Sequence, residues 1–272
     1  MLYQICLWPK NEGIVAVPLA EAGIIPGIKV DIGAKELAGH SGEKITEGLD
    51  GLRERLGEYA QRGARFAKWR AVIALGDGMP SQACIKANAH ALARYAALCQ
   101  EKGLVPIVEP EVLMEGTHSL ERCFEVTEDV LRAVFQQLYR QGVSLESLLL
   151  KPNMVLSGSS FPAQESVAEV ADATVRCLLR VVPAAVPGIV FLSGGQSGEL
   201  ATAHLNAMNA QLPSCLPWAL SFSFGRALQQ PAMAIWGGQE ANVAAAQQAL
   251  LHRAACNQAA RRGQYCAAMD RA

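Results

Sequence analysis

The chain has 272 residues, of which 51% are hydrophobic and 18% charged, and its formal net charge is -1. This composition predicts a globular protein with a sizeable core, and the balanced charge argues against general binding to nucleic acid or to an anionic membrane. The sequence holds no apolar run of roughly eighteen residues, as a membrane-spanning helix would need. The opening MLYQICLWPKNEGIVAVPLA is interrupted by proline and polar residues, which is untypical of a signal peptide, so we expect a cytoplasmic protein.

Short apolar runs alternate with longer helical patterns along the chain. The stretch 1–25 offers one doubtful strand, LYQICLW, and then the helix-like GIVAVPLAEAG. Six later runs, rich in β-branched or aromatic residues, predict strands at 27–33, 66–75, 104–112, 147–155, 188–195 and 218–225. Apolar residues that recur at intervals of three and four predict helices at 81–103, 119–142, 164–183, 198–210 and 239–262.

This alternation predicts an α/β fold with a parallel sheet, because parallel strands need a crossover that is usually helical. No GxGxxG follows an early strand, so a TIM (β/α)8 barrel is favoured over a Rossmann fold. Six βα units are recognisable where a closed barrel has eight, which predicts an incomplete barrel. We expect a single domain over 1–272, with an atypical N-terminal segment at 1–12 and a short tail at 263–272.

The cysteines and histidines offer no recognisable metal site. The eight cysteines are scattered without a CxxC pair, which predicts reduced, buried thiols. The five histidines show neither HxH nor HxxxH spacing, so no zinc ligand set is visible. We therefore expect no metal and no cofactor.

Charged residues inside apolar strands are the most informative feature, because burying an ion is costly unless it is paired or functional. Members of a same-strand pair are two residues apart and therefore point to one face. In a barrel that face is the mouth where active sites are built, although a single pair would also fit the solvated face of an edge strand. These residues are Lys29 and Asp31, Lys68 and Arg70, Glu109 and Glu111, Lys151, and Arg226 just past the last strand.

Lys151 is the candidate nucleophile. It follows three leucines and precedes Pro152, which disfavours a helix and keeps the strand end extended. Desolvation at the end of an apolar strand and a second cation nearby, Lys68, both disfavour its ammonium form. A neutral amine is what Schiff-base formation with a carbonyl substrate requires. Glu109 and Glu111 are candidates for the general acid/base and for a charge partner of the lysines.

Two later segments predict an anion site. SGGQSGE at 193–199 combines a strand end, a Gly-Gly turn and a helix start, whose backbone amides suit a phosphate. Gly225 and Arg226 follow the next strand, and a phosphate site in the loops of the last two strands is a recurrent barrel feature. The glycine turn alone would equally fit an ordinary tight turn.

From about Gly23 to Gln264 the sequence closely resembles class I fructose-bisphosphate aldolases, especially bacterial and plant-like members. The stretches that carry the resemblance are GIKVD, TEGLDGL, FAKWR, LARYA, GLVPIVEPE, LLKPNMV, FLSGGQS, PWALSFSFGRAL and WGG. The resemblance implies a lyase of glycolysis and gluconeogenesis that reversibly cleaves fructose 1,6-bisphosphate, a sugar phosphate, into dihydroxyacetone phosphate and glyceraldehyde 3-phosphate without metal. It also implies a homotetramer, which is the usual assembly of such proteins.

The resemblance gives each candidate residue a role. Lys151 matches the Schiff-base lysine, Glu109 the general acid/base, and Lys68 the lysine that assists carbinolamine chemistry. Glu111 matches the carboxylate beside the lysines. The residues matching the phosphate site on the ketone side are Ser193, Gly194, Gly225 and Arg226, and those near the other phosphate are Lys29 and Arg70.

The sequence departs from the family pattern at both ends. The family has two further βα units before the aligned part, one of which carries an aspartate needed for carbon–carbon cleavage, and its tail ends in a tyrosine used in proton transfer. We find neither in this sequence, which predicts a truncated aldolase with little cleavage activity. The alternative function is that of an impaired fragment or pseudoenzyme that acts by binding.

Two other lyase classes fit the sequence less well. A deoxyribose-phosphate or transaldolase-like lyase is disfavoured by the Glu-Pro-Glu motif and the paired phosphate-site features. A zinc-dependent aldolase is disfavoured by the lack of histidine ligands.

Overall fold

The computed structural model describes residues 5–8, 20–211 and 216–271, and the chain divides into two compact units. The first unit comprises Met1–Leu113, Glu128–Lys151 and Val181–Pro187. The second comprises Met114–Thr127, Pro152–Arg180 and Gly188–Ala272. Among the described residues, no helix is long and apolar enough to cross a membrane.

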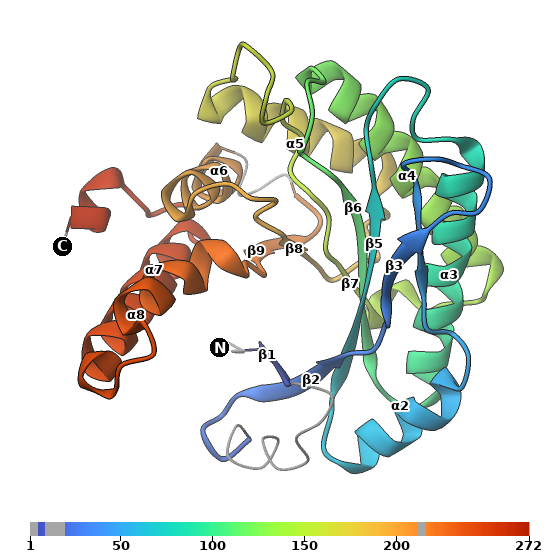
Figure 1. Cartoon of the computed structure of the whole chain (residues 1–272), viewed down its shortest axis with the longest axis horizontal. Helices are drawn as coiled ribbons and strands as arrows, with labels where there is room; N and C mark the ends of the chain where they lie inside the picture. The colour runs from blue at the N-terminus through green and yellow to red at the C-terminus, as the bar shows by residue number, and fades with distance from the viewer. Residues whose placement is uncertain (1–4, 9–19, 212–215, 272) are drawn as a thin grey trace. The chain divides into compact units, whose positions relative to one another are not determined.

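A parallel sheet forms the centre of the first unit (Figure 1). Neighbouring strands pair in parallel throughout, and helix α3 packs against β5 and β6. A separate antiparallel pair, β3 and β4, follows β2. The sheet strands in spatial order are β1 (Ile5–Trp8), β2 (Ile25–Lys29), β5 (Phe66–Ile73), β6 (Val105–Val112) and β7 (Leu149–Leu150). The remaining elements are β3 (Gly33–Glu36), β4 (Lys44–Glu47), α2 (Leu52–Gln61), α3 (Gln82–Glu101), α4 (Leu120–Arg140, shared with the second unit) and the 3-10 helix η1 (Leu145–Ser147).

Strand β5 shows why the charged residues share one face. Trp69 is fully buried beneath α3, where its ring centroid lies 5.6 Å from that of Tyr95. The Tyr95 hydroxyl donates to the carbonyl oxygens of Ala67 at 2.6 Å and Ile107 at 3.2 Å, which fastens α3 to both strands. Because side chains alternate along a strand, fixing Trp69 under the helix turns Lys68 to the opposite face.

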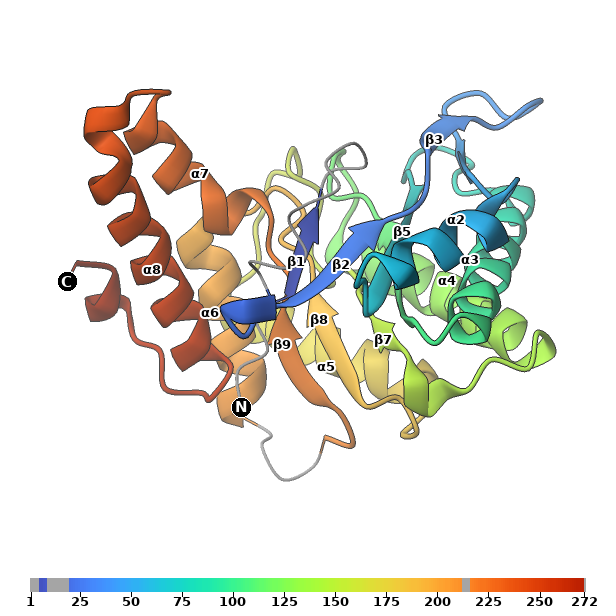
Figure 2. The same cartoon turned by 90° about the horizontal axis from the view of Figure 1, so that it is seen from below.

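The second unit consists mainly of helices beside a parallel pair of strands, β8 and β9, in which Phe191 lies opposite Phe222. Helices α6, α7 and α8 pack together, and the C-terminal 3-10 helix η3 returns to α6 and α8 (Figure 2). The elements are α5 (Val167–Val181), β8 (Gly188–Phe191), α6 (Gly198–Gln211), β9 (Ala219–Phe222), α7 (Arg226–Trp236), η2 (Glu240–Asn242), α8 (Val243–Ala260) and η3 (Ala267–Arg271).

The predicted βα alternation is confirmed, with differences that have physical reasons. The doubtful strand near the start is β1, so the described residues hold seven parallel strands, the six predicted and this one. The predicted strand 147–155 shrinks to β7, because Pro152 has no amide hydrogen to extend the ladder. Helix α7 was not predicted, since Pro231 interrupts its pattern, and neither was the short α2. Most of the helix-like segment 13–23 lies outside the described residues, and the single domain over 1–272 stays a prediction.

Candidate active site

The register of three strands brings the candidate catalytic side chains together in the first unit. Residue 68 of β5 stands opposite Ile107 and Arg70 stands opposite Glu109 in the parallel ladder with β6. On the other side of β6, the amide of Lys151 donates to the carbonyl oxygen of Val108 at 2.8 Å. This hydrogen bond extends the ladder between β6 and β7 by one residue, so Lys151 lies beside Glu109.

A single carboxylate joins the two lysines. The Nζ of Lys68 donates to Oε2 of Glu109 at 2.6 Å, and the Nζ of Lys151 lies 3.1 Å from Oε1. The three side chains are only 8%, 4% and 10% exposed for Lys68, Glu109 and Lys151. Two lysines thus share one buried carboxylate, that of Glu109.

Burial lowers the pKa of Lys151 below the ordinary lysine value. Desolvation is the largest cause, since an ammonium ion loses more hydration than a neutral amine. The negative charge of Glu109 works against this shift and the positive charge of Lys68 works with it. The surroundings therefore favour the neutral, nucleophilic form more than water does.

The remaining charged residues of the sheet form two further pairs. Glu111 accepts a short hydrogen bond from the Nε of Arg70, so its bonded partner is this arginine, although its charge also raises the pKa of Lys151. Lys29 donates to the carboxylate of Asp31, and its own side chain is 43% exposed. The predicted residues for the second phosphate, Lys29 and Arg70, are therefore each held by a carboxylate.

Asp31 is a site residue to which the sequence analysis gave no role. Its side chain is 2% exposed, and Oδ2 accepts from the backbone amide of Arg70 at 3.2 Å while Oδ1 accepts from that of Gly33 at 3.1 Å. It also binds the amine of Lys29, so one carboxylate contacts the side chain of Lys29 and the backbone of Arg70. The signal was its spacing of two from Lys29 in GIKVDIG.

The predicted anion loops lie in the second unit. The loop after β8 turns at Gly194 and Gly195, whose φ angles of 57° and 91° favour glycine, and α6 then begins at Gly198. A Cβ placed on Gly195 would lie 3.7 Å from Nη2 of Arg226, so this arginine lies beside the turn. The structure thus brings the Ser193–Gly195 turn and the start of α7 together.

Buried polar groups support this loop through hydrogen bonds. The amide of Gln196 donates to the carbonyl oxygen of Ser193 at 3.0 Å, and its side chain lies 2.6 Å from Nδ1 of His204. Burial lowers the pKa of His204 to about 4, so the imidazole is neutral at neutral pH. Neither residue received a role of its own from the sequence, because Gln196 stands within the glycine turn segment before α6 and His204 is an isolated polar residue in that helix, without a periodic signal.

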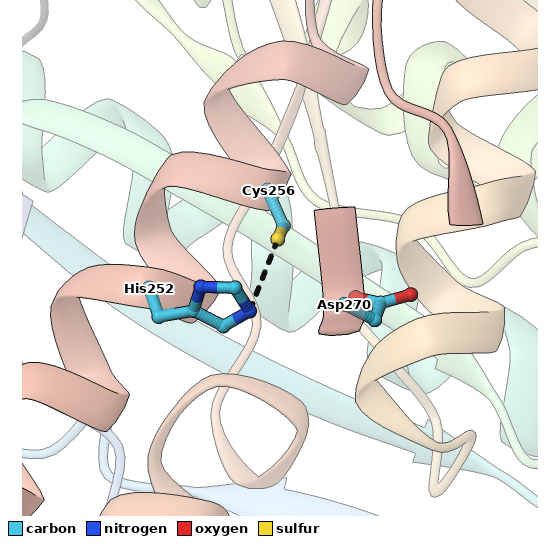
Figure 3. Close-up of side chains that lie close together, drawn as sticks. All are labelled: His252, Cys256 and Asp270. Carbon is cyan, nitrogen blue, oxygen red and sulfur yellow. Dashed lines mark hydrogen bonds between the residues drawn. The ribbon is translucent and has the colours of Figure 1, made fainter. Parts of the chain in front are cut away.

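One cluster among the described residues has the donor atoms for a metal ion: His252, Cys256 and Asp270, whose donor atoms lie within 4.8 Å of one another (Figure 3). Asp270 already accepts hydrogen bonds from Arg253 and from Tyr265. Burial raises the pKa of the Cys256 thiol, which favours its protonated form. These contacts suit a hydrogen-bonded cluster better than a metal centre, because the carboxylate is occupied and the thiol retains its proton.

Comparison with known proteins decides the family. A family model described as fructose-bisphosphate aldolase class-I matches residues 2–272. The chain belongs to this family. A probable fructose-bisphosphate aldolase class 1 of Xanthomonas campestris is 60% identical, with 91% of this chain and 74% of the relative covered. The cytosolic fructose-bisphosphate aldolase 6 of Arabidopsis thaliana is 57% identical over 97% of this chain and 74% of the relative.

A solved structure agrees. Fructose-bisphosphate aldolase from Plasmodium falciparum, crystallised with TRAP and a small-molecule inhibitor, superposes with a TM-score of 0.89 at 51% identity, covering 91% of this chain and 72% of that one. Class I aldolases have the TIM-barrel type of fold and are lyases, which confirms the predicted fold class, enzyme class and function. The comparisons do not favour the non-catalytic alternative.

Proposed function

We propose that Lys151 is the covalent nucleophile in the cleavage of fructose 1,6-bisphosphate by this aldolase. The observation that carries the proposal is the buried amine of Lys151, with its lowered pKa, 3.1 Å from the carboxylate of Glu109. The neutral amine attacks the ketone carbon to give a carbinolamine, and loss of water then gives an iminium ion. The Glu109 carboxylate then takes the proton of the C4 hydroxyl group, the C3–C4 bond breaks, and glyceraldehyde 3-phosphate leaves while the electron pair passes to the iminium ion to give an enamine on Lys151. Protonation of the enamine at C3 and addition of water release dihydroxyacetone phosphate and the free amine.

Glu109 is the proposed proton carrier for these steps. Its carboxylate contacts both amines, so it can take the proton that Lys151 loses on attack and return it to the departing hydroxyl group. Lys68 holds the other carboxylate oxygen and thereby fixes the direction in which Glu109 presents its lone pairs. Glu111 acts at longer range, through its charge and its hold on Arg70.

The phosphate-binding roles are also proposals. We assign the phosphate on the ketone side to Ser193, Gly194, Gly225 and Arg226, supported by the turn beside the arginine. We assign the other phosphate to Lys29 and Arg70, supported by the buried Asp31 that binds the amine of Lys29 and the backbone amide of Arg70. A cytoplasmic location is supported by relatives named cytosolic in Arabidopsis and cytoplasmic in Pisum sativum. A homotetramer rests on the family resemblance, and light scattering after gel filtration tests it.

Borohydride trapping tests the role of Lys151. We expect dihydroxyacetone phosphate and borohydride to leave one stable adduct, mapped by mass spectrometry to Lys151, with a rate that reaches half its maximum below pH 10.5, the ordinary lysine value. Lys151→Met abolishes the adduct, whereas Lys44→Met, at an exposed lysine paired with Glu36, leaves it unchanged. An adduct on another lysine, or none in the unsubstituted protein, contradicts the proposal.

A further inference from the structure

The C-terminal tail is fastened to the second unit through a buried arginine. Arg253 of α8 has a side chain that is 5% exposed, and its Nη1 donates to the carboxylate of Asp270 in η3. The other carboxylate oxygen accepts from the hydroxyl of Tyr265. The amide of Tyr265 donates to Oδ1 of Asn206 at 2.9 Å, which ties the tail to α6 as well. Asp270 thus connects the tail to the interior.

Arg253 also contacts the first turn of α6. Its Nη2 donates to Oγ1 of Thr202 at 2.7 Å, and that hydroxyl lies 2.6 Å from the carbonyl oxygen of Gly198. A Cβ placed on Gly198 would lie 3.3 Å from the Nε of Arg253, so the guanidinium lies directly against this glycine. A cation at a helix N-terminus is opposed by the helix dipole, and two carboxylates offset this for Arg253. The Asp270 carboxylate is hydrogen-bonded and only 18% exposed, whereas Oε1 of Glu199 lies 3.7 Å from Nη1 and its side chain is 56% exposed, so Asp270 is the stronger partner.

The first turn of α6 is where the two anion elements meet. The Ser193–Gly195 turn leads into α6, and a Cβ on Gly198 would lie only 2.7 Å from the carbonyl oxygen of Ala227, next to Arg226 at the start of α7. This close approach puts the backbones of α6 and α7 in direct contact at Gly198. Whatever holds Gly198 in place therefore also sets the distance between the turn and Arg226.

We propose that the Asp270–Arg253 pair is a positioning device for the anion site formed by the Ser193–Gly195 turn and Arg226. The inference rests on the proposed phosphate-binding role of that site. Without the Asp270 carboxylate, the buried guanidinium keeps only the more distant, exposed carboxylate of Glu199 in the first turn of α6 and shifts toward it. The first turn then loses its contact at Thr202, and the turn and Arg226 no longer converge on one anion.

Protection of Arg226 by inorganic phosphate tests the inference. Phenylglyoxal modifies arginine side chains, and mass spectrometry reports the phosphate concentration that halves modification of Arg226. We expect Asp270→Asn to raise this concentration about tenfold, which corresponds to about 1.4 kcal/mol. Tyr265→Phe, which removes one hydroxyl group and keeps the ion pair, is expected to raise it about threefold. Asp172→Asn, which breaks an exposed ion pair with Arg176 in the same unit, is expected to change nothing.

A second readout separates positioning from a general loss of structure. Trapping of dihydroxyacetone at Lys151 needs no phosphate, and we expect Asp270→Asn to leave its rate unchanged. The inference is overturned if neither tail variant changes the protection of Arg226 by phosphate. It is also overturned if Asp270→Asn lowers phosphate protection and the trapping rate at Lys151 equally. If phosphate does not protect Arg226 in the unsubstituted protein, the anion site itself is refuted. Missing adducts at Lys151 refute only the role of that lysine, because the phosphate readout does not depend on it.

Discussion

Substitution of Glu109 by glutamine is the most demanding test of the lysine cluster, because one carboxylate serves two buried cations. The contacts are 2.6 Å to Lys68 and 3.1 Å to Lys151. At an effective dielectric constant of about 20, unit charges at these separations attract by about 6 and about 5 kcal/mol before desolvation is counted. Removing one partner of a buried pair has a net cost of about 3–5 kcal/mol, since the other charge stays buried without compensation. We expect Glu109→Gln to lower the free energy of unfolding by about 4 kcal/mol.

Lys151→Met is the matched variant, because it removes a charge from the same cluster and leaves Glu109 bonded to Lys68. The pKa of Lys151 is lowered in the folded protein, so the unfolded chain binds this proton more tightly than the folded chain does. The resulting penalty is fully present below the folded pKa and disappears as the pH rises toward 10.5. Methionine removes that penalty at neutral pH, so we expect this variant to lose less than about 1 kcal/mol.

Urea unfolding followed by tryptophan fluorescence measures both variants, since Trp69 is fully buried in the same sheet. The trapping rate at Lys151 is measured alongside and is expected to fall about 10²- to 10⁴-fold in Glu109→Gln, the usual contribution of a general acid/base. Loss of the negative charge also lowers the pKa of Lys151 further, which moves the pH profile of trapping to lower pH. Equal stability of the two variants would refute the view that Glu109 compensates two buried cations.

Two further predictions concern the rest of the site. Asp31→Asn is expected to raise KM for fructose 1,6-bisphosphate roughly tenfold with a smaller change in kcat, because Asp31 binds Lys29 and the backbone amide of Arg70. Steady-state kinetics measure this effect. An unchanged KM contradicts the assignment of these residues to the second phosphate. Dialysis against EDTA is expected to leave the borohydride-trapped adduct at Lys151 unchanged, since the iminium ion itself activates the substrate. A loss of adduct that added zinc restores would show that a metal is required.

The sequence was most informative where charge interrupts a buried strand. Lys68 and Glu109 stand in segments apolar enough to be recognised as strands, and the spacing of two from their neighbours placed them on one face. Their contact was predictable from that pattern, because parallel strands align their carboxyl ends. Which carboxylate bonds to which cation was not predictable, since the partner of Glu111 depends on the register between β5 and β6.

The contact between the C-terminal tail and α8 could not be predicted from the sequence, for a different reason. Arg253 lies in a helix with no clear amphipathic pattern, and its partner Asp270 comes from a segment with no periodicity at all. The contact between them forms only when the tail packs against α8. Neither residue stands in a local sequence pattern that would predict its burial or its partner. A buried arginine in a helix is visible only once the neighbouring elements are in place.

The strand register that places Lys151 also determines the burial, and therefore the pKa, of its amine. Leu148 and Leu150 are fully buried, and their alternation with Leu149 and Lys151 fixes which face of β7 carries the lysine. A slip of one residue would turn the amine to the opposite face and expose the leucines, so burial of the apolar side chains selects the register. Pro152 then stops the ladder directly after the lysine. The register that buries the leucines on one face thus places the amine on the other, where its own burial lowers its pKa, so folding of this segment also favours the neutral amine.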